Sequence, residues 1–340
     1  MNQAAAKSLL QGKVIPACPL ALTAQRRWDE LRQRTLLEYY LQAGAGGVAV
    51  GVHTTQFCIR DPRHDLFEPV LALAAETQTR SNVAQATPFV LIGGICGSTP
   101  QATAEAAVLR KHRYHAGLVS LGALSEANDE HLIAHCRELS QIIPLFGFYL
   151  QPAAGGRVLS YGFWRRFAEI ESVVAIKVAA FNRYQTIDVV RAVVESGRDD
   201  IALYTGNDDN IIADLITPYR FRVDGREVER RFVGGLLGQW AVGTRRAVEI
   251  LALCHRSQSD SSLLPELLAL NAALTDANAA IFDAAHDFAG CIPGIHEVLR
   301  RQGLLESVAC LDPKETLSSG QSEEIDRVLR AYPHLFDNPS

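Results

Sequence analysis

The feature that most constrains the fold is a repeated alternation of short apolar runs with stretches of helical periodicity. Apolar runs of this length, rich in β-branched residues, are typical of strands that are buried on both faces. The eight runs are residues 14–22, 47–53, 88–97, 116–123, 144–151, 173–179, 201–208 and 231–239. Because a helix-like stretch follows each run, we expect parallel strands joined by right-handed helical crossovers.

The number of these units favours one α/β architecture over another. Eight strand–helix units within residues 12–257 match the size of a (β/α)8 barrel, with an open doubly wound sheet as the alternative. Residues 258–336 have only helical patterns, and we expect a helical appendage that packs on the barrel. The polar segment 217–230, TPYRFRVDGREVER, contains an Asp-Gly turn signal and predicts an inserted loop or short hairpin. The predicted fold class is α/β, a (β/α)8 TIM barrel with a C-terminal helical extension.

Composition narrows the class of protein further. The net charge of −5 does not indicate the excess of basic residues that is typical of nucleic-acid-binding proteins. The first residues lack the apolar core and cleavage site of a signal peptide, and no run approaches the roughly 18 apolar residues of a membrane span. Seven cysteines without a CxxC pair indicate free thiols in a reducing compartment. We expect a soluble cytoplasmic protein with a small-molecule substrate and neither nucleic acid nor membrane as partner.

One charged residue interrupts the apolar strand VVAIKVAAFN, residues 173–182. Lysine rarely enters a buried strand, because removing an ammonium group from water is costly. If Lys177 points into the barrel, strand alternation directs Ile176 and Val178 toward the helices. The alternative is that Lys177 reaches solvent from the strand end or pairs with a carboxylate.

Other polar groups stand at the carboxyl ends of the predicted strands, where (β/α)8 barrels place their chemistry. They are His53, Thr54 and Thr55 after the second strand, Tyr149 in the fifth, and Gly206, Asn207 and Asp208 after the seventh. A lysine, a tyrosine and a pair of hydroxyl groups suit Schiff-base chemistry on a carbonyl substrate. The lysine needs a pKa of roughly 7–8, and the required depression of about 3 units corresponds to about 4 kcal/mol that desolvation can provide.

These motifs resemble the dihydrodipicolinate synthase / N-acetylneuraminate lyase family of class I aldolases and dehydratases. YLQPAAGG (149–156) is similar to that family's Y-x-x-P-x-x-x-G, and VVAIKVAAFN is similar to its lysine strand. GVAVGVHTTQF (47–57) resembles the strand that ends in G-T-T-G-E, and YTGNDD (204–209) resembles the G-x-D turn. The motifs keep their order and spacing along residues 12–333.

The resemblance implies roles for individual residues. Lys177 would form the Schiff base and Tyr149 would relay protons. Thr54 and Thr55 would hold the carboxylate of pyruvate or another 2-oxo acid, with His53 and Gly206 as further substrate contacts. No metal and no cofactor is implied, and a homo-oligomer, dimer or tetramer, is expected.

Departures from the family pattern bear on the substrate. His53, Gln56 and Phe57 replace the glycine and glutamate around the threonines, and Ala154 stands where the synthases place an arginine. LVSLGALSEAND also lacks the tyrosine that a neighbouring subunit receives. We therefore expect an aldolase or hydro-lyase that acts on a 2-oxo acid, other than the synthase of lysine biosynthesis. The alternative is a non-catalytic barrel that binds a keto acid or sugar acid.

Three other patterns have structural explanations that compete with functional ones. AGAGGVAVG (43–51) follows a helix and precedes a strand, which is the reverse of a dinucleotide-binding loop. His131 and His135 share a helix face as a metal pair would, but a third ligand is not evident from the spacing. RDPRHD (60–65) would suit a metal-dependent aldolase and also reads as a loop before a helix.

Overall fold

A computed structural model describes residues 1–81, 83 and 87–337. Eight strands form one parallel sheet in the order β1-β10-β7-β6-β5-β4-β3-β2. The strands are β1 (Val14–Pro16), β2 (Gly47–Val50), β3 (Val90–Ile95), β4 (Ala116–Val119), β5 (Leu145–Leu150), β6 (Val173–Ala179), β7 (Ala202–Thr205) and β10 (Gly234–Leu237). A parallel bridge between Ala17 and Ala49 joins the first strand to the second, which closes the sheet into a barrel. The predicted (β/α)8 barrel is confirmed, and the open sheet is excluded.

Helices surround the strands and continue beyond them. The helices are α1 (Gln3–Leu10), α2 (Glu30–Gln42), α3 (Phe67–Arg80), α4 (Thr99–Lys111), α5 (Asp129–Ser140), α6 (Tyr161–Phe167), α7 (Arg183–Glu195), α8 (Ile211–Ile216), α9 (Thr244–Arg256), α10 (Leu264–Ile281), α11 (Cys291–Arg301) and α12 (Gln321–Ala331). Asn128, Ser160 and Asn182 accept hydrogen bonds from the first turns of α5, α6 and α7, which fixes where these helices begin. Within the described residues, no helix combines the length and the apolarity that a membrane crossing requires.

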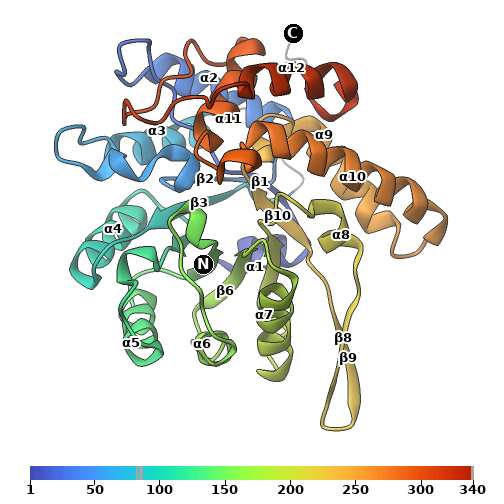
Figure 1. Cartoon of the computed structure of the whole chain (residues 1–340). Helices are drawn as coiled ribbons and strands as arrows, with labels where there is room; N and C mark the ends of the chain where they lie inside the picture. Colours follow the sequence, from blue (N-terminus) through green and yellow to red (C-terminus); the bar gives the residue numbers. More distant parts are fainter. Residues whose placement is uncertain (82, 84–86, 338–340) are drawn as a thin grey trace.

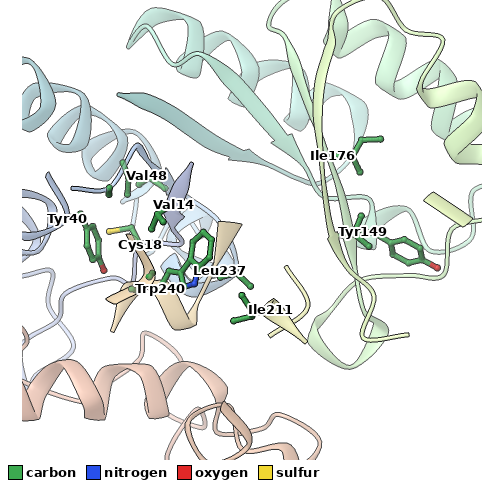
Figure 2. Close-up of a cluster of buried hydrophobic side chains, with 14 of the residues drawn as sticks. Val14, Cys18, Tyr40, Val48, Tyr149, Ile176, Ile211, Leu237 and Trp240 are labelled. Atoms are coloured by element: carbon green, nitrogen blue, oxygen red, sulfur yellow. The ribbon is translucent and has the colours of Figure 1, made fainter. Parts of the chain in front are cut away.

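Two apolar layers result from the alternation of side chains along the strands. The inner layer fills the barrel and includes Ile92, Leu118 and Phe146. The outer layer lies between strands and helices, and Figure 2 shows part of it, with Val48 and Ile176 among its members. Both faces of each strand are therefore buried, which explains the nearly continuous apolar runs in the sequence.

Helix α1 covers the amino-terminal end of the barrel. It ends four residues before β1 begins, and Leu9 packs with the inner apolar layer. The hydroxyl of Tyr204, which points into the barrel, donates a hydrogen bond to the carbonyl oxygen of Leu9 at 2.8 Å. The opposite, carboxyl-terminal end is the one left for a functional site.

The segment predicted as a loop or short hairpin forms a two-stranded antiparallel ribbon that projects away from the barrel (Figure 1). Its strands are β8 (Tyr219–Val223) and β9 (Arg226–Arg230). Asp224 and Gly225 at the turn both have left-handed backbones, with φ of 49° and 77°. Asp-Gly tolerates these angles, and such two-residue turns match the twist of a hairpin.

The C-terminal helices α10, α11 and α12 gather on one side of the barrel, orange to red in Figure 1. α10 is tied to the loop after β7, because Asn278 donates to the carbonyl oxygen of Asp208 at 2.7 Å and Thr275 donates to that of Asp209 at 2.8 Å. At the C-terminus, the carboxylate of Asp337 accepts the N–H groups of Arg245 (2.7 Å) and Arg246 (3.1 Å) at the start of α9. The extension is thus fastened to the barrel at both of its ends.

Candidate active site

The carboxyl-terminal ends of the strands surround a cavity. Its titratable lining residues come from four separate parts of the chain. They are His53 after β2, Lys177 in β6, Asp208 after β7 and Cys291 at the start of α11. Their convergence in one cavity marks this end of the barrel as the candidate active site.

Lys177 points into the barrel, which is the first of the two orientations considered from the sequence. Ile176 and Val178 lie on the other face of β6 in the outer layer, and the Lys177 residue is only 8% exposed. Its Nζ lies 4.6 Å from the centroid of the Phe148 ring on the neighbouring strand. Burial lowers the pKa of Lys177 below its ordinary value, against the opposing influence of Asp208 and Cys291. Desolvation therefore favours the neutral, nucleophilic amine.

Gly206 makes room for the lysine side chain. A Cβ atom on this glycine would lie 2.5 Å from Cε and 3.0 Å from Cγ of Lys177. The backbone φ of Gly206 is not in the left-handed region, so the requirement for glycine here comes from close approach. The predicted site residue Gly206 thus lines the cavity and shapes it around Lys177.

Asp208 faces the same cavity, and the sequence indicated only its place after the seventh strand. Its carboxylate Oδ1 accepts the N–H of Gln239 at 3.4 Å. Burial raises the pKa of Asp208, while the positive charge of Lys177 opposes that rise. A carboxyl group with a raised pKa is suited to exchange protons near neutral pH. The signal was present in the G-x-D turn YTGNDD, but a turn motif does not reveal which side chain faces the cavity.

A buried polar network holds the loops that carry these groups. Asn207 accepts the N–H of Phe181 at 2.9 Å and donates to the carboxylate of Asp214 at 2.9 Å. Asp214 also accepts hydrogen bonds from Thr205 (2.7 Å) and Arg183. Because Asp214 is fully buried and paired with Arg183, its charge is compensated inside the protein. The network joins the ends of β6 and β7 and so sets the relative position of Lys177 and Asp208.

The two predicted threonines have different surroundings. Thr54 lines the cavity. Thr55 does not, since its hydroxyl donates to the carbonyl oxygen of Cys18 at 2.7 Å and accepts the N–H groups of Gly51 (3.0 Å) and Val52 (3.3 Å). Those three bonds occupy the hydroxyl of a fully buried residue. The expectation that Thr55 contacts the substrate is corrected accordingly: it fixes the loop that presents Thr54.

His53 lies beside Thr54 in the single helical turn η1 (His53–Thr55) and lines the cavity, as predicted. Burial, together with the nearby charge of Lys177, lowers the pKa of His53 to about 4. The imidazole is therefore neutral at pH 7, with one nitrogen able to donate and the other able to accept a hydrogen bond.

Tyr149 does not line the cavity, and its predicted position in the site is wrong. It belongs to the outer apolar layer together with Ile176 (Figure 2). Its ring lies 5.6 Å from that of Trp164, and its hydroxyl accepts the N–H of Leu159 at 3.2 Å. The physical reason is the phase of β5, in which Phe148 and Leu150 point inward and the intervening residue must point outward.

The C-terminal extension completes the cavity wall with Phe282, Phe288, Cys291 and Ile295. The rings of Phe288 and Phe181 meet edge to face with centroids 5.5 Å apart. Both residues have left-handed backbones, with φ of 66° and 51°. Such angles are uncommon for aromatic residues and occur where surrounding structure imposes them. Burial raises the pKa of Cys291 far above its usual range, which keeps the thiol protonated.

The loop between α10 and α11 is held by Asp283. Its carboxylate accepts the N–H of Gly290 at 2.9 Å and lies 2.6 Å from Nδ1 of His286. Gln321 at the start of α12 adds a hydrogen bond to the carbonyl oxygen of Gly290 at 3.0 Å. The sequence predicted an appendage but not this contribution to the cavity, because periodicity does not indicate which loop reaches the barrel.

The alternative metal ligands are not brought together. His135 is buried with Nδ1 2.8 Å from the hydroxyl of Thr99, whereas His131 is exposed on the same helix. Asp61 pairs with Arg63 within its own loop. No group of three or more His, Cys, Asp or Glu side chains in the described part of the chain is arranged to hold a metal ion.

Fold and site together define a (β/α)8 barrel with a buried lysine that faces a cavity at the carboxyl-terminal end. Solved structures with this fold include dihydrodipicolinate synthase from Aquifex aeolicus, with a TM-score of 0.75 and 16% identity over 96% of this chain and 100% of that one. They also include dihydrodipicolinate synthase from Acinetobacter baumannii complexed with pyruvate (TM-score 0.74, 16% identity, 94% and 98% covered). A third is N-acetylneuraminate lyase from Mycoplasma synoviae (TM-score 0.71, 13% identity, 96% and 98% covered).

The chain therefore has the fold of the dihydrodipicolinate synthase / N-acetylneuraminate lyase family, as the sequence motifs indicated. At 13–16% identity the likeness establishes the fold alone. No protein-family model matches the sequence, and the search of curated proteins gives no match.

Proposed function

We propose that the protein is a lyase that binds a 2-oxo acid covalently through a Schiff base on Lys177. The observation that carries this proposal is the buried amine of Lys177, which faces a cavity at the carboxyl-terminal end of the barrel. A neutral amine in such a place attacks a carbonyl carbon and forms an imine with loss of water. The imine then acts as the electron sink for making or breaking a bond at the adjacent carbon.

The substrate carboxylate is assigned to the η1 turn. The Thr54 hydroxyl lies at the cavity wall, where it donates a long hydrogen bond of 3.4 Å to the carbonyl oxygen of Cys18 that a carboxylate would replace. Neutral His53 offers a ring N–H. Hydrogen bonds to a carboxylate are stronger than those between neutral groups, so two donors suffice to orient a 2-oxo acid. Thr55 supports this turn from behind through its bond to the carbonyl oxygen of Cys18.

Proton transfer is assigned to Asp208 in place of Tyr149. Formation of the imine requires a proton on the departing oxygen, and Asp208 shares the cavity with Lys177. Its raised pKa makes the carboxyl group a donor and acceptor close to neutral pH. Neutral His53 is the second group within the cavity that can accept or donate.

The cavity also bears on which reaction is catalysed. Ala154, which stands where the synthases place an arginine, lines the cavity and offers no charge to a second substrate. This supports an aldolase or hydro-lyase other than the synthase of lysine biosynthesis. The expected homo-oligomer and the division at residue 258 stay predictions.

A second candidate is a non-catalytic barrel that binds a keto acid or sugar acid. The position of Tyr149 in the outer layer favours it, since the hydroxyl that the resemblance assigned to proton relay is outside the cavity. Reduction with borohydride in the presence of pyruvate separates the two candidates. A reduced adduct on Lys177 supports the lyase, and its absence with every 2-oxo acid tested contradicts it.

A further inference from the structure

The lining of the cavity combines a few polar side chains with a larger set of apolar ones. The polar side chains include Lys177, Asp208, Thr54 and His53, to which the 2-oxo acid head group is assigned, and Gln151. The remaining wall is built mainly from large apolar side chains. A substrate whose carbonyl lies at Lys177 must therefore place its distal atoms against the apolar wall.

Six side chains form this apolar wall, contributed by β5, the loop after β6, and the C-terminal extension. They are Phe148, Leu150, Phe181, Phe282, Phe288 and Ile295. No arginine lines the cavity in the part of the chain that the structure describes, and Ala154 presents only a methyl group. Apart from the amide of Gln151, the six side chains and their neighbours in the described lining offer a distal group neither a counter-charge nor a row of hydrogen-bond partners.

We propose that the natural substrate is a 4-hydroxy-2-oxo acid that carries an uncharged apolar group, aliphatic or aromatic, at C4. The inference rests on the proposed Schiff-base function. A chain with several hydroxyl groups would lose more hydrogen bonds to water than this wall replaces, which weakens binding. An apolar chain would gain from burial at the same place. Aromatic distal groups can also pack edge to face with Phe181 and Phe288, whose rings already meet in this way.

A second pocket next to the cavity also disfavours the binding of anionic substrates. It shares His53, Ala154 and Phe288 with the cavity and is lined by the carboxylates of Asp312 and Glu315. Like charges in proximity disfavour a phosphate or a second carboxylate on the substrate. The same carboxylates would accept hydrogen bonds from the hydroxyl groups of a polyol, and a preference for polyols is the competing outcome of the test.

The proposed reaction is a retro-aldol cleavage of the bond between C3 and C4, and its atoms and electrons balance. Lys177 and the C2 carbonyl form the imine and release water. Asp208 accepts the proton of the C4 hydroxyl, the C3–C4 electron pair moves into an enamine, and C4 leaves as an apolar aldehyde. Asp208 returns the proton to C3, and water hydrolyses the imine to pyruvate and free Lys177. One 4-hydroxy-2-oxo acid thus gives one pyruvate and one aldehyde, with no other reactant.

A matched panel of substrates tests the inference by pyruvate release. The panel comprises the aldol adducts of pyruvate with benzaldehyde, isobutyraldehyde, glyceraldehyde and glyoxylate. We expect kcat/KM for the first two to exceed that for the glyceraldehyde and glyoxylate adducts by about tenfold or more. Equal or higher kcat/KM for either polar adduct overturns the inference.

Variants of Phe288 and Phe181 test whether these two side chains cause the preference for apolar substrates. Phe288→Asn and Phe181→Asn keep a residue that tolerates a left-handed backbone, and each should reduce the apolar preference by about tenfold. Tyr184→Ser, at an aromatic residue that is 84% exposed, is the matched control and should leave the preference unchanged. An unchanged preference in both asparagine variants, with folding confirmed by circular dichroism, contradicts the assignment of the wall. If neither variant folds, the panel on the natural protein decides alone.

Borohydride trapping distinguishes failure of the proposed substrate class from failure of the proposed Schiff-base function. A borohydride adduct of pyruvate on Lys177 together with a polar substrate preference refutes only the substrate class. Absence of the adduct refutes the Schiff-base function itself.

Discussion

The side chain of Lys177 occupies the space that a Cβ atom at position 206 would need. An ideal Cβ on Gly206 would lie 2.5 Å from Cε of Lys177 and 2.9 Å from Cβ of Ala179. The glycine after β7 and the lysine of β6 are therefore a matched pair. The position of the amine in the cavity depends on both residues.

Substitution of Gly206 by alanine should displace Lys177 and slow adduct formation. Overpacking of this kind costs typically 1–3 kcal/mol, so we expect the rate of borohydride trapping to fall about tenfold or more. Gly162→Ala is the control, because its Cβ would meet nothing closer than 3.6 Å. Equal trapping rates in the two variants would contradict the role given to Gly206. The measurement is adduct mass against time.

Replacement of Asp208 should slow both turnover and adduct formation. Asp208→Asn removes the acid–base group and should lower kcat by about 10²–10⁴-fold. Pyruvate should still be trapped on Lys177, but more slowly, because the same group protonates the oxygen that departs when the imine forms. The negative charge of Asp208 raises the pKa of Lys177, so its loss should lower that pKa. The pH midpoint of trapping should therefore move to lower pH in Asp208→Asn. Unchanged kcat, or a shift to higher pH, would contradict the assignment.

Trapping by the natural protein should itself respond to pH in a defined direction. Only the neutral amine attacks a carbonyl, so the rate should rise with pH through the pKa of Lys177 and then level off. Because burial lowers that pKa, the plateau should begin below the range of an ordinary lysine, whose pKa is about 10.4. A rate that still rises at pH 10 would show that the amine is not desolvated. Initial trapping rates across a pH series provide the measurement.

Tyr149→Phe should affect stability and leave catalysis nearly intact. The hydroxyl accepts a hydrogen bond from the N–H of Leu159, and its removal leaves that donor without its partner. We expect a loss of about 1–3 kcal/mol in the free energy of unfolding and a kcat within about threefold of the natural value. A hundredfold fall in kcat without loss of stability would contradict this expectation and would indicate that Tyr149 relays protons.

The two threonines should respond differently to valine. Thr54→Val removes a donor at the cavity and should raise KM by a factor that corresponds to about 1.5–3 kcal/mol, with little change in kcat. Thr55→Val removes a hydroxyl with three buried hydrogen bonds and should lower the free energy of unfolding by about 1–3 kcal/mol. The comparison of steady-state kinetics with chemical denaturation distinguishes them. A rise in KM in Thr55→Val alone, at full stability, would reverse the two roles.

The sequence predicted the barrel because eight apolar runs each need burial on both faces. It left two orientations open for Lys177, and the inward one holds because Ile176 and Val178 on either side are apolar and suit the helix layer. The hairpin followed from Asp224 and Gly225, whose side chains suit left-handed angles.

The sequence could not predict the orientation of Tyr149. β5 is LFGFYL, with large apolar residues on both faces, so composition does not distinguish inward from outward positions. Which residues of β5 point inward is set by the pairing of Phe148 with Lys177, two residues that are distant in the chain. The same reason applies to Phe288, which reaches the cavity only because Asp283 and Gln321 fix its loop.

The central claim is tested most directly by mass spectrometry after borohydride reduction in the presence of pyruvate. The account predicts one reduced pyruvate adduct per chain, located on Lys177 by peptide mapping, and no adduct in Lys177→Ala. An adduct on another lysine, or none with any 2-oxo acid, would contradict it.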